Sequence, residues 1–438
     1  MNAICLIVDR LHAGYLGAYG NSWIETPALD RLASRSLVFD RALIDSPQLE
    51  RLYRSYWQGW HAMCPPPPAS RPGLAALLRE AGVSTALLTD EPQVARHPLA
   101  VDFDELIEID PPWQPHGVGE IHQTHFARCF VEIIHWLEAA RGPFLLWCHL
   151  GGLGTTWDAP LRFRQAYWDQ GDPQPPEAAD VPDQMLSPDY DPDELLGIAQ
   201  SYAGQAALLD ACFGALLEFL DSRPAGRLAK KTLLTLSSAR GFPLGEHRRV
   251  GPCDDALFGE LVHVPWMMRF PDAAAAAVRS QALVEPADLW ATLLDWWGVE
   301  AVPPSPTALS VMPIVRGEAE TLRDRLCILG PRGTAALGCV ESPRTAEGGR
   351  PTCGFWDRSL GSGPERAIRT PAWYLRAASE PELFAKPDDR WEVNNVTSRC
   401  REVVECLQDA LVQYELALPA ARVAELPPLS DVLLNGLE

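Results

Sequence analysis

Basic residues are scarce in this sequence. The chain has 438 residues with 37 Lys and Arg against 58 Asp and Glu, which gives a formal net charge of −21. An acidic surface repels nucleic acids and anionic membranes, so we expect neither as a partner. It also provides no long-range attraction for an anionic substrate. Any anion-binding site therefore has to be a local basic pocket.

Long apolar runs and paired cysteine motifs are also missing. We find no run long and apolar enough to span a bilayer, and the chain enters a predicted strand without a signal-peptide pattern. The 11 cysteines are odd in number and scattered, without the spacing of a zinc site or a disulfide framework. The sequence therefore predicts reduced thiols in a cytoplasmic protein.

The most informative stretch comes at the start of the chain. Residues 4–8 form an unbroken apolar run, Ile-Cys-Leu-Ile-Val, which is followed by Asp9 and Arg10. Such a run is typical of a strand that is covered on both faces in a parallel sheet. Ligands of open α/β sheets bind at the carboxyl ends of the strands, so we expect Asp9 and Arg10 at a functional edge.

Predicted strands and helices alternate through most of the chain. Further strands are predicted at residues 37–40, 84–89, 144–148, 232–237 and 262–270, and helices at 27–33, 73–81, 125–140, 195–220 and 286–297. This alternation predicts an α/β domain, residues 1–328, with a mainly parallel central sheet flanked by helices. Short strand-like pieces and a helix at residues 401–416 predict a smaller C-terminal α+β domain, residues 329–438.

The order of the motifs resembles the sulfatase family of the alkaline phosphatase superfamily, over essentially the whole chain. The matching segments are Val8-Asp9-Arg10-Leu11, Leu16-Gly17-Ala18-Tyr19-Gly20, Thr26 to Ala33, Leu209-Asp210, Gly245-Glu246-His247, Asp288 to Asp295, and Glu382-Leu383-Phe384 with Asn394-Asn395. The resemblance implies an alkaline-phosphatase-like hydrolase fold. In working members it also implies a formylglycine nucleophile and a divalent cation that polarises the sulfate.

The segment that should carry the nucleophile lacks its chemistry. Asp45-Ser46-Pro47 aligns without a gap to the family's Ser-Pro-x-Cys-x-Pro-x-Arg pattern, which places Leu49 on the nucleophile and Arg51 on the proline. Leucine has no lone pair for attack and cannot be oxidised to an aldehyde. No catalytic nucleophile is therefore predicted.

The family's cation site is reduced in the same way. An Asp-Asp pair after the first strand is here Asp9-Arg10, and an Asp-His or Asp-Asn pair after a later strand is here Ala239-Arg240. Only Asp9 offers an oxygen ligand, whereas a hard divalent cation requires several. We expect the family's calcium or magnesium to be lost and predict no cofactor. A family lysine is also replaced, by Asp254.

Two interpretations of the remaining charged residues stay open. Arg10 or Arg240 neutralises Asp9 as a structural ion pair, or both arginines form an oxyanion pocket with help from Arg51 or Arg54. The predicted pocket also contains two histidines that the resemblance places near the site. His149 and His247 are then either pocket residues or hydrogen-bonded structural histidines.

The sequence favours a pseudoenzyme, a non-catalytic binding or scaffolding relative of the sulfatases. Its expected partner is a small sulfated or phosphorylated ligand, or a protein. The alternative is an active hydrolase of sulfate or phosphate esters with a rebuilt, metal-free site in which the arginines act as electrophiles. A third possibility is a purely structural subunit.

Overall fold

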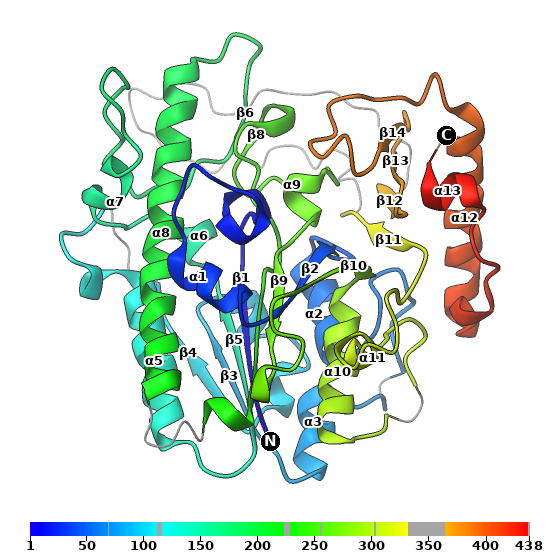
Figure 1. Cartoon of the computed structure of the whole chain (residues 1–438), viewed down its shortest axis with the longest axis horizontal. Coiled ribbons are helices and arrows are strands. Elements are labelled where there is room, and N and C mark those ends of the chain that lie inside the picture. The colour runs from blue at the N-terminus through cyan, green and yellow to red at the C-terminus, as the bar shows by residue number, and fades with distance from the viewer. Residues whose placement is uncertain are drawn as a thin grey trace, which may run out of the picture.

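An eight-stranded sheet forms the centre of the molecule (Figure 1). The computed structural model describes residues 1–68, 70–111, 116–222, 228–254, 256–301, 304–331 and 364–436. In spatial order the strands are β10 (Val278–Val284), β2 (Leu37–Ala42), β9 (Trp266–Arg269), β7 (Thr232–Ser237), β1 (Asn2–Val8), β5 (Phe144–Leu150), β3 (Ser84–Thr89) and β4 (Glu105–Glu108). Of these strands, β9 runs antiparallel to its neighbours and the others pair in parallel. The predicted mainly parallel α/β fold is confirmed.

Strand β1 explains why both faces of the sheet are covered. Ala3, Cys5 and Ile7 belong to the core on one face, and Ile4, Leu6 and Val8 to the core on the other. Successive side chains of a strand point to opposite faces, so an unbroken apolar run requires a helical layer on each side.

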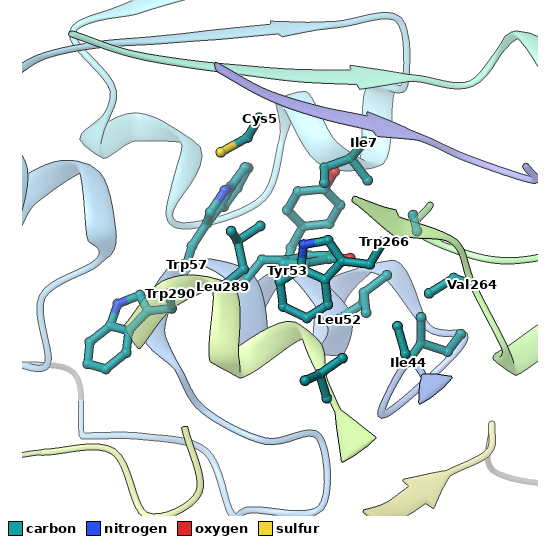
Figure 2. Packing of buried hydrophobic residues seen from close by; sticks show 14 of the residues in the cluster. Cys5, Ile7, Ile44, Leu52, Tyr53, Trp57, Val264, Trp266, Leu289 and Trp290 are labelled. Atoms are coloured by element: carbon teal, nitrogen blue, oxygen red, sulfur yellow. The ribbon is translucent and has the colours of Figure 1, made fainter. Parts of the chain in front are cut away.

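The two helical layers are separate (Figure 1). One contains α2 (Leu49–Gln58), α3 (Leu74–Glu80) and α10 (Pro286–Trp297), and the other contains α1 (Pro27–Ala33), α5 (His125–Ala139) and α8 (Pro192–Ser222). Figure 2 shows the first core, where the rings of Trp57, Trp266 and Trp290 gather beside Leu289 and Ile7. Shorter helices are α4 (Pro92–Ala95), α6 (Gly152–Thr155), α7 (Leu161–Gln165), α9 (Gly259–Val262) and α11 (Met312–Val315).

Helix α8 corrects the expectation that no segment could span a bilayer. By length and composition α8 is apolar enough to do so, but 67% of its most apolar window is buried inside the fold. It packs against α1, α5 and α7. A core helix passes the same test of composition, so this property is weak evidence for a membrane span.

Helix α8 also caps a helix that lies far away in the sequence. Thr26 occupies the predicted cap position of α1, but its side chain does not cap the helix. The Asp210 carboxylate accepts from the backbone N–H groups of Ala28 (3.1 Å) and Leu29 (2.8 Å) instead. These bonds satisfy N–H groups that a helix start leaves free.

Several predicted boundaries differ from the structure. The strand predicted at 262–270 is present but shorter, as β9, because Val262 is the last residue of the helical turn α9. The predicted exposed excursion at 171–194 is mostly exposed and contains β6 (Gln184–Met185), which pairs with β8 (Arg249–Val250). Strands β4 and β10 were not predicted, since exposed residues interrupt their apolar pattern.

The C-terminal part is an antiparallel four-stranded sheet covered by a helix (Figure 1). Its elements are β11 (Leu326–Leu329), β12 (Arg366–Arg369), β13 (Trp373–Ala377), β14 (Glu382–Ala385), α12 (Arg401–Ala417) and α13 (Asp431–Asn435). Ile328 and Tyr374 join the core of the α/β domain, whereas Cys327 and Leu375 pack with α12. This sheet starts at Leu326, and residues 332–363 of the predicted second domain lie outside the described residues.

Candidate functional site

Four charged side chains meet where β1 and β7 end. Arg240 donates from Nε to Asp9 Oδ1 (3.1 Å) and from Nη2 to Asp9 Oδ2 (2.5 Å). Its Nη1 donates to Asp254 Oδ2 (2.9 Å). Arg10 binds the carboxylate of Asp254 through Nη1 to Oδ1 (2.7 Å) and Nη2 to Oδ2 (3.0 Å). We call Asp9, Arg10, Arg240 and Asp254 the arginine–aspartate cluster.

The backbone at the end of β1 is fixed on both sides of Arg10. This residue has a φ of 66°, in the left-handed region that costs a non-glycine residue about 1–2 kcal/mol. Its carbonyl accepts from the Tyr202 hydroxyl (2.7 Å), and the next N–H, of Leu11, donates to Ser238 Oγ (3.1 Å). These bonds hold the turn that directs the Arg10 guanidinium to Asp254.

The cluster is largely buried and internally neutral. Asp9 and Arg10 are 3% and 2% exposed. Burial by itself would raise the pKa of Asp9, but Arg240 and Arg10 hold this pKa well below its usual range. Burial opposes the charge of Arg240, while Asp9 and Asp254 raise the pKa of its guanidinium. Two guanidinium groups and two carboxylates have formal charges that cancel.

The residues at this edge do not fit a divalent cation. Both oxygens of Asp9 already accept hydrogen bonds from Arg240. Ala239 is fully buried and offers only a methyl group, and two positive guanidinium groups stand at the other family ligand positions. Calcium requires six to eight oxygen ligands and magnesium a near-octahedral set. The side chains present at this edge therefore do not supply the ligand set of either ion.

The position that the resemblance assigns to the nucleophile carries an aliphatic side chain. Leu49 is the first residue of α2, is 4% exposed and belongs to the apolar core. The nearby hydroxyls have structural roles: Ser46 Oγ accepts from the Gln48 N–H (3.2 Å), and Ser55 Oγ donates to Asp45. Ser238 Oγ donates to the Arg240 carbonyl (2.6 Å).

The structure does not bring Arg51 and Arg54 into the cluster. Arg51 donates from Nη1 to the Ala62 carbonyl (2.9 Å), on the loop that follows α2. Arg54 is buried, with Nε and Nη2 lacking a hydrogen-bond partner among the described residues. The main charges acting on Asp9 come from Arg240 and Arg10. Neither Arg51 nor Arg54 therefore joins Arg10 and Arg240 in the oxyanion pocket that is the second interpretation of the sequence.

His149 is a structural histidine in this arrangement. It lies inside β5, not after it, and is completely buried. Its Nδ1 lies 2.5 Å from the Tyr53 hydroxyl. Burial lowers the pKa of His149, so the neutral ring is favoured.

Among the described residues His247 forms no hydrogen bond or ion pair with the cluster. Its ring stacks on Phe258 with the centroids 3.6 Å apart. Nδ1 lies 2.9 Å from Glu260 Oε1, and Nε2 donates to the Glu392 carbonyl (3.0 Å). Burial would lower the pKa of His247, but the hydrogen bond and charge of Glu260 raise it.

One further group of buried side chains has the composition of a metal site. Asp90, His125 and Cys129 offer ligand atoms that lie within 4.8 Å of one another. However, His125 Nε2 and Asp90 Oδ2 are 2.6 Å apart, which is a hydrogen-bond distance. The other Asp90 oxygen accepts from the Gly151 N–H (2.7 Å). The contact is therefore that of an Asp–His pair in the core.

A cavity of about 330 Å³ lies between the end of β2 and the C-terminal domain. We call it the interdomain pocket. Its charged and histidine lining residues are His12, Asp40, Arg41, Glu260, His263, Arg279, Arg369, Lys386, Arg390 and Glu392, and its aromatic ones are Tyr19, Tyr374 and Trp391. No member of the arginine–aspartate cluster lines it.

The sequence does not reveal this pocket, because its walls come from distant segments. Arg41 and Arg369 are separated by more than 300 residues and lie on different sheets. The segment from Lys386 to Glu392 lies between two family-like motifs, Glu382-Leu383-Phe384 and Asn394-Asn395, and belongs to neither. Only the packing of the C-terminal domain on the α/β domain brings these groups together.

A family model named Sulfatase matches residues 1–299 of the chain. The chain belongs to the sulfatase family. The match covers the whole eight-stranded sheet and all four residues of the arginine–aspartate cluster.

Two curated relatives are sulfatases of different specificity. The N-acetylglucosamine-6-O-sulfatase of Bacteroides thetaiotaomicron is 32% identical over 126 residues, which is 28% of this chain and 21% of the relative. Human iduronate 2-sulfatase is 23% identical over 341 residues, 63% of this chain and 60% of the relative. The chain therefore spans less than two thirds of either relative.

Solved structures match over nearly the full length. The phosphonate monoester hydrolase of Agrobacterium radiobacter superposes with a TM-score of 0.69 at 18% identity, covering 97% of this chain and 96% of that one. A protein solved with its substrate D-glucosamine-2-N,6-O-disulfate gives 0.71 at 16% identity, covering 98% and 99%. At this identity the likeness establishes the fold, and it includes the C-terminal sheet.

Proposed function

We propose that this member of the sulfatase family does not hydrolyse sulfate or phosphate esters and acts as a binding or scaffolding protein. The observation that carries the proposal is the arginine–aspartate cluster. At the family's cation position Arg10 and Arg240 bind Asp9 and Asp254, so the only family ligand that is kept accepts from a guanidinium.

The geometry also argues against the alternative of a rebuilt, metal-free hydrolase. Arginines could stabilise the charge that develops on a transferred sulfate or phosphate group only if their N–H groups were free to reach it. Each of Arg10 and Arg240 instead donates at least two hydrogen bonds to the cluster's carboxylates. No hydroxyl or thiol stands at the nucleophile position, because Leu49 occupies it.

Turnover of 4-nitrophenyl sulfate and 4-nitrophenyl phosphate tests this proposal. The full chain is assayed in excess chelator, and again with calcium or magnesium, while elemental analysis measures any copurified metal. We expect no hydrolysis above that of an Asp9→Asn variant and no stoichiometric calcium or magnesium. Hydrolysis by the native chain that persists in chelator and disappears in Arg240→Met would establish the rival hydrolase.

If the protein binds a ligand, the binding site has to lie outside the arginine–aspartate cluster. The cluster is internally neutral, so it offers no net charge to an anion or a cation. We propose that the expected small sulfated or phosphorylated ligand binds elsewhere at the same edge of the sheet. The cavity between the two domains is large enough for a small molecule.

A further inference from the structure

The interdomain pocket contains more cationic than anionic side chains. Five arginines and lysines line it, namely Arg41, Arg279, Arg369, Lys386 and Arg390, against three carboxylates, Asp40, Glu260 and Glu392. The chain as a whole has a net charge of −21, so this local excess of positive charge opposes the overall balance. A basic pocket on an acidic protein is where an anion can be held locally.

All three carboxylates already have partners. Asp40 pairs with Arg279. Glu392 Oε1 lies 3.0 Å from Lys386 Nζ, and its Oε2 accepts from the Gly259 N–H (2.8 Å). Glu260 bonds to His247 outside the pocket lining. The acidic groups are thus not available to neutralise the remaining cations.

Arg41, Arg369 and Arg390 are the cations that stay without a carboxylate. Among the described residues none of them forms an ion pair. Arg41 Nη1 makes a long bond to the Gln281 carbonyl (3.4 Å), and Arg390 Nη2 donates to the Tyr19 carbonyl (2.9 Å). Arg369 is 7% exposed, and its Nη1 donates to the carbonyl of Trp373 (3.1 Å) and to those of two neighbouring residues.

Electrostatic effects on neighbouring groups agree with an excess of positive charge. Burial and the charge of Arg41 lower the pKa of Arg369 to about 9, although the charge of Glu392 acts in the opposite direction. Burial and the charges of Arg390, Arg369 and Lys386 lower the pKa of His263 to about 3, against the bond that it donates to the Asp40 carbonyl. An anion among these groups would relieve the mutual repulsion.

We propose that the interdomain pocket binds a small phosphate monoester, with its phosphate between Arg41 and Arg369 and its organic part against Trp391. The match is one of charge, size and surface. A phosphate monoester is close to a dianion at pH 7, since its second pKa is about 6. Two arginines without carboxylates balance such a charge, and guanidinium groups suit phosphate oxygens. The Arg390 guanidinium lies over the Trp391 ring, 4.9 Å from its centroid, and this side chain is still 47% exposed at the pocket wall, so its remaining surface is open to a ring or chain.

Calorimetric titration with phenyl phosphate tests the site, with phenyl sulfate and inorganic phosphate as comparison probes. We expect phenyl phosphate to bind more tightly than the monoanionic phenyl sulfate, and more tightly than inorganic phosphate because of Trp391. Arg369→Met should weaken binding by about tenfold or more. Arg41→Gln should do the same, and this half-buried residue avoids the folding risk of replacing buried Arg369.

Two control variants show whether the loss of affinity is specific to the interdomain pocket. Arg35→Gln removes the same charge from an exposed pair with Asp221, and it should leave the affinity for phenyl phosphate unchanged. Asp9→Asn combined with Arg240→Met changes the arginine–aspartate cluster without leaving a buried charge unpaired, and it should also leave the affinity unchanged. Equal loss in Arg35→Gln and Arg41→Gln, or loss only in this double variant, would overturn the proposal.

The inference rests on the proposed function, and the same titration distinguishes their failures. Phosphate release from phenyl phosphate is measured in each sample. Release that depends on Arg240 would refute the non-catalytic function. Absence of both binding and release would refute only the interdomain phosphate site.

Discussion

The arginine–aspartate cluster and the interdomain pocket lie at the same edge of the central sheet, yet their charges are arranged in opposite ways. In the cluster two guanidinium groups face two carboxylates, and all four side chains bind one another. In the pocket three arginines have no carboxylate partner among the described residues. The first arrangement balances its charges internally, whereas the second keeps an excess of positive charge.

Under the proposed non-catalytic function, this difference indicates how a site loses its chemistry while the fold is kept. An unpaired Asp9 at the end of a buried strand would be costly. The guanidinium of Arg240, which follows the neighbouring strand, offsets that cost without a metal ion. Asp254 then balances the charge of the second guanidinium, that of Arg10. The proposed binding site is then the interdomain pocket, where both domains contribute side chains.

The largest effect should follow from breaking the cluster at Asp9. We expect Asp9→Asn to lower the free energy of unfolding by about 3–5 kcal/mol, because Arg240 then loses its bidentate carboxylate in a buried setting. Urea unfolding followed by circular dichroism measures this change.

A double-mutant cycle and a surface pair complete that experiment. Asp9→Asn combined with Arg240→Met should cost clearly less than the sum of the single changes, since no charge is left unpaired. Arg35→Gln breaks an Arg–Asp pair of similar length that is exposed, and it should cost only about 0.2–1 kcal/mol. A cost for Asp9→Asn as small as that of Arg35→Gln would show that the cluster does not stabilise the fold.

Much of this cluster can be predicted from the sequence. The apolar run of β1 fixes where Asp9 and Arg10 emerge, and the motif order places Arg240 at the end of a neighbouring strand. The ion pair between Arg240 and Asp9 is one of the two interpretations that the sequence leaves open. The sequence shows Asp254, the second carboxylate of the cluster, only as the replacement of a family lysine. Nothing in the sequence around Asp254 indicates which arginine it contacts.

Other features depend on tertiary packing. Arg51 and Arg54 lie on α2 near the predicted site, but the rotation of the helix directs them to the following loop and to the interior. The sequence predicts His149 just after its strand, but pairing of β5 with both neighbours extends the strand by two residues to Leu150. The walls of the interdomain pocket come from two domains, so no motif could place Arg41 beside Arg369.

A smaller effect should come from rebuilding a cation site in place of the cluster. The triple variant Arg10→Asp, Ala239→Asp, Arg240→Asn restores oxygen ligands at the three changed family positions beside Asp9. We expect calcium at a hundred times its Kd to stabilise this variant by about 2.7 kcal/mol, as linkage requires. Thermal unfolding with and without calcium measures the shift.

The native chain is the matched control, and it should show no shift with calcium. Adding Asp9→Ala to the triple variant should abolish the calcium response, since it removes the one ligand that the native chain keeps. A calcium-dependent shift in the native chain itself would mean that a cation can displace Arg240 from Asp9, and the contrast between the two regions would then be wrong.

The smallest predicted effect is the change in the free energy of unfolding when Arg41 of the interdomain pocket is replaced. Because Arg41 has no carboxylate partner among the described residues, and its charge lowers the pKa of Arg369, its removal relieves repulsion. We expect Arg41→Gln to change the free energy of unfolding by no more than about 0.5 kcal/mol, with any change a gain. Urea unfolding at low salt measures it, and added salt should shrink the gain because it screens like charges. A loss of about 2 kcal/mol would instead assign Arg41 a structural bond. The pocket would then resemble the cluster, with its positive charge already used by the fold.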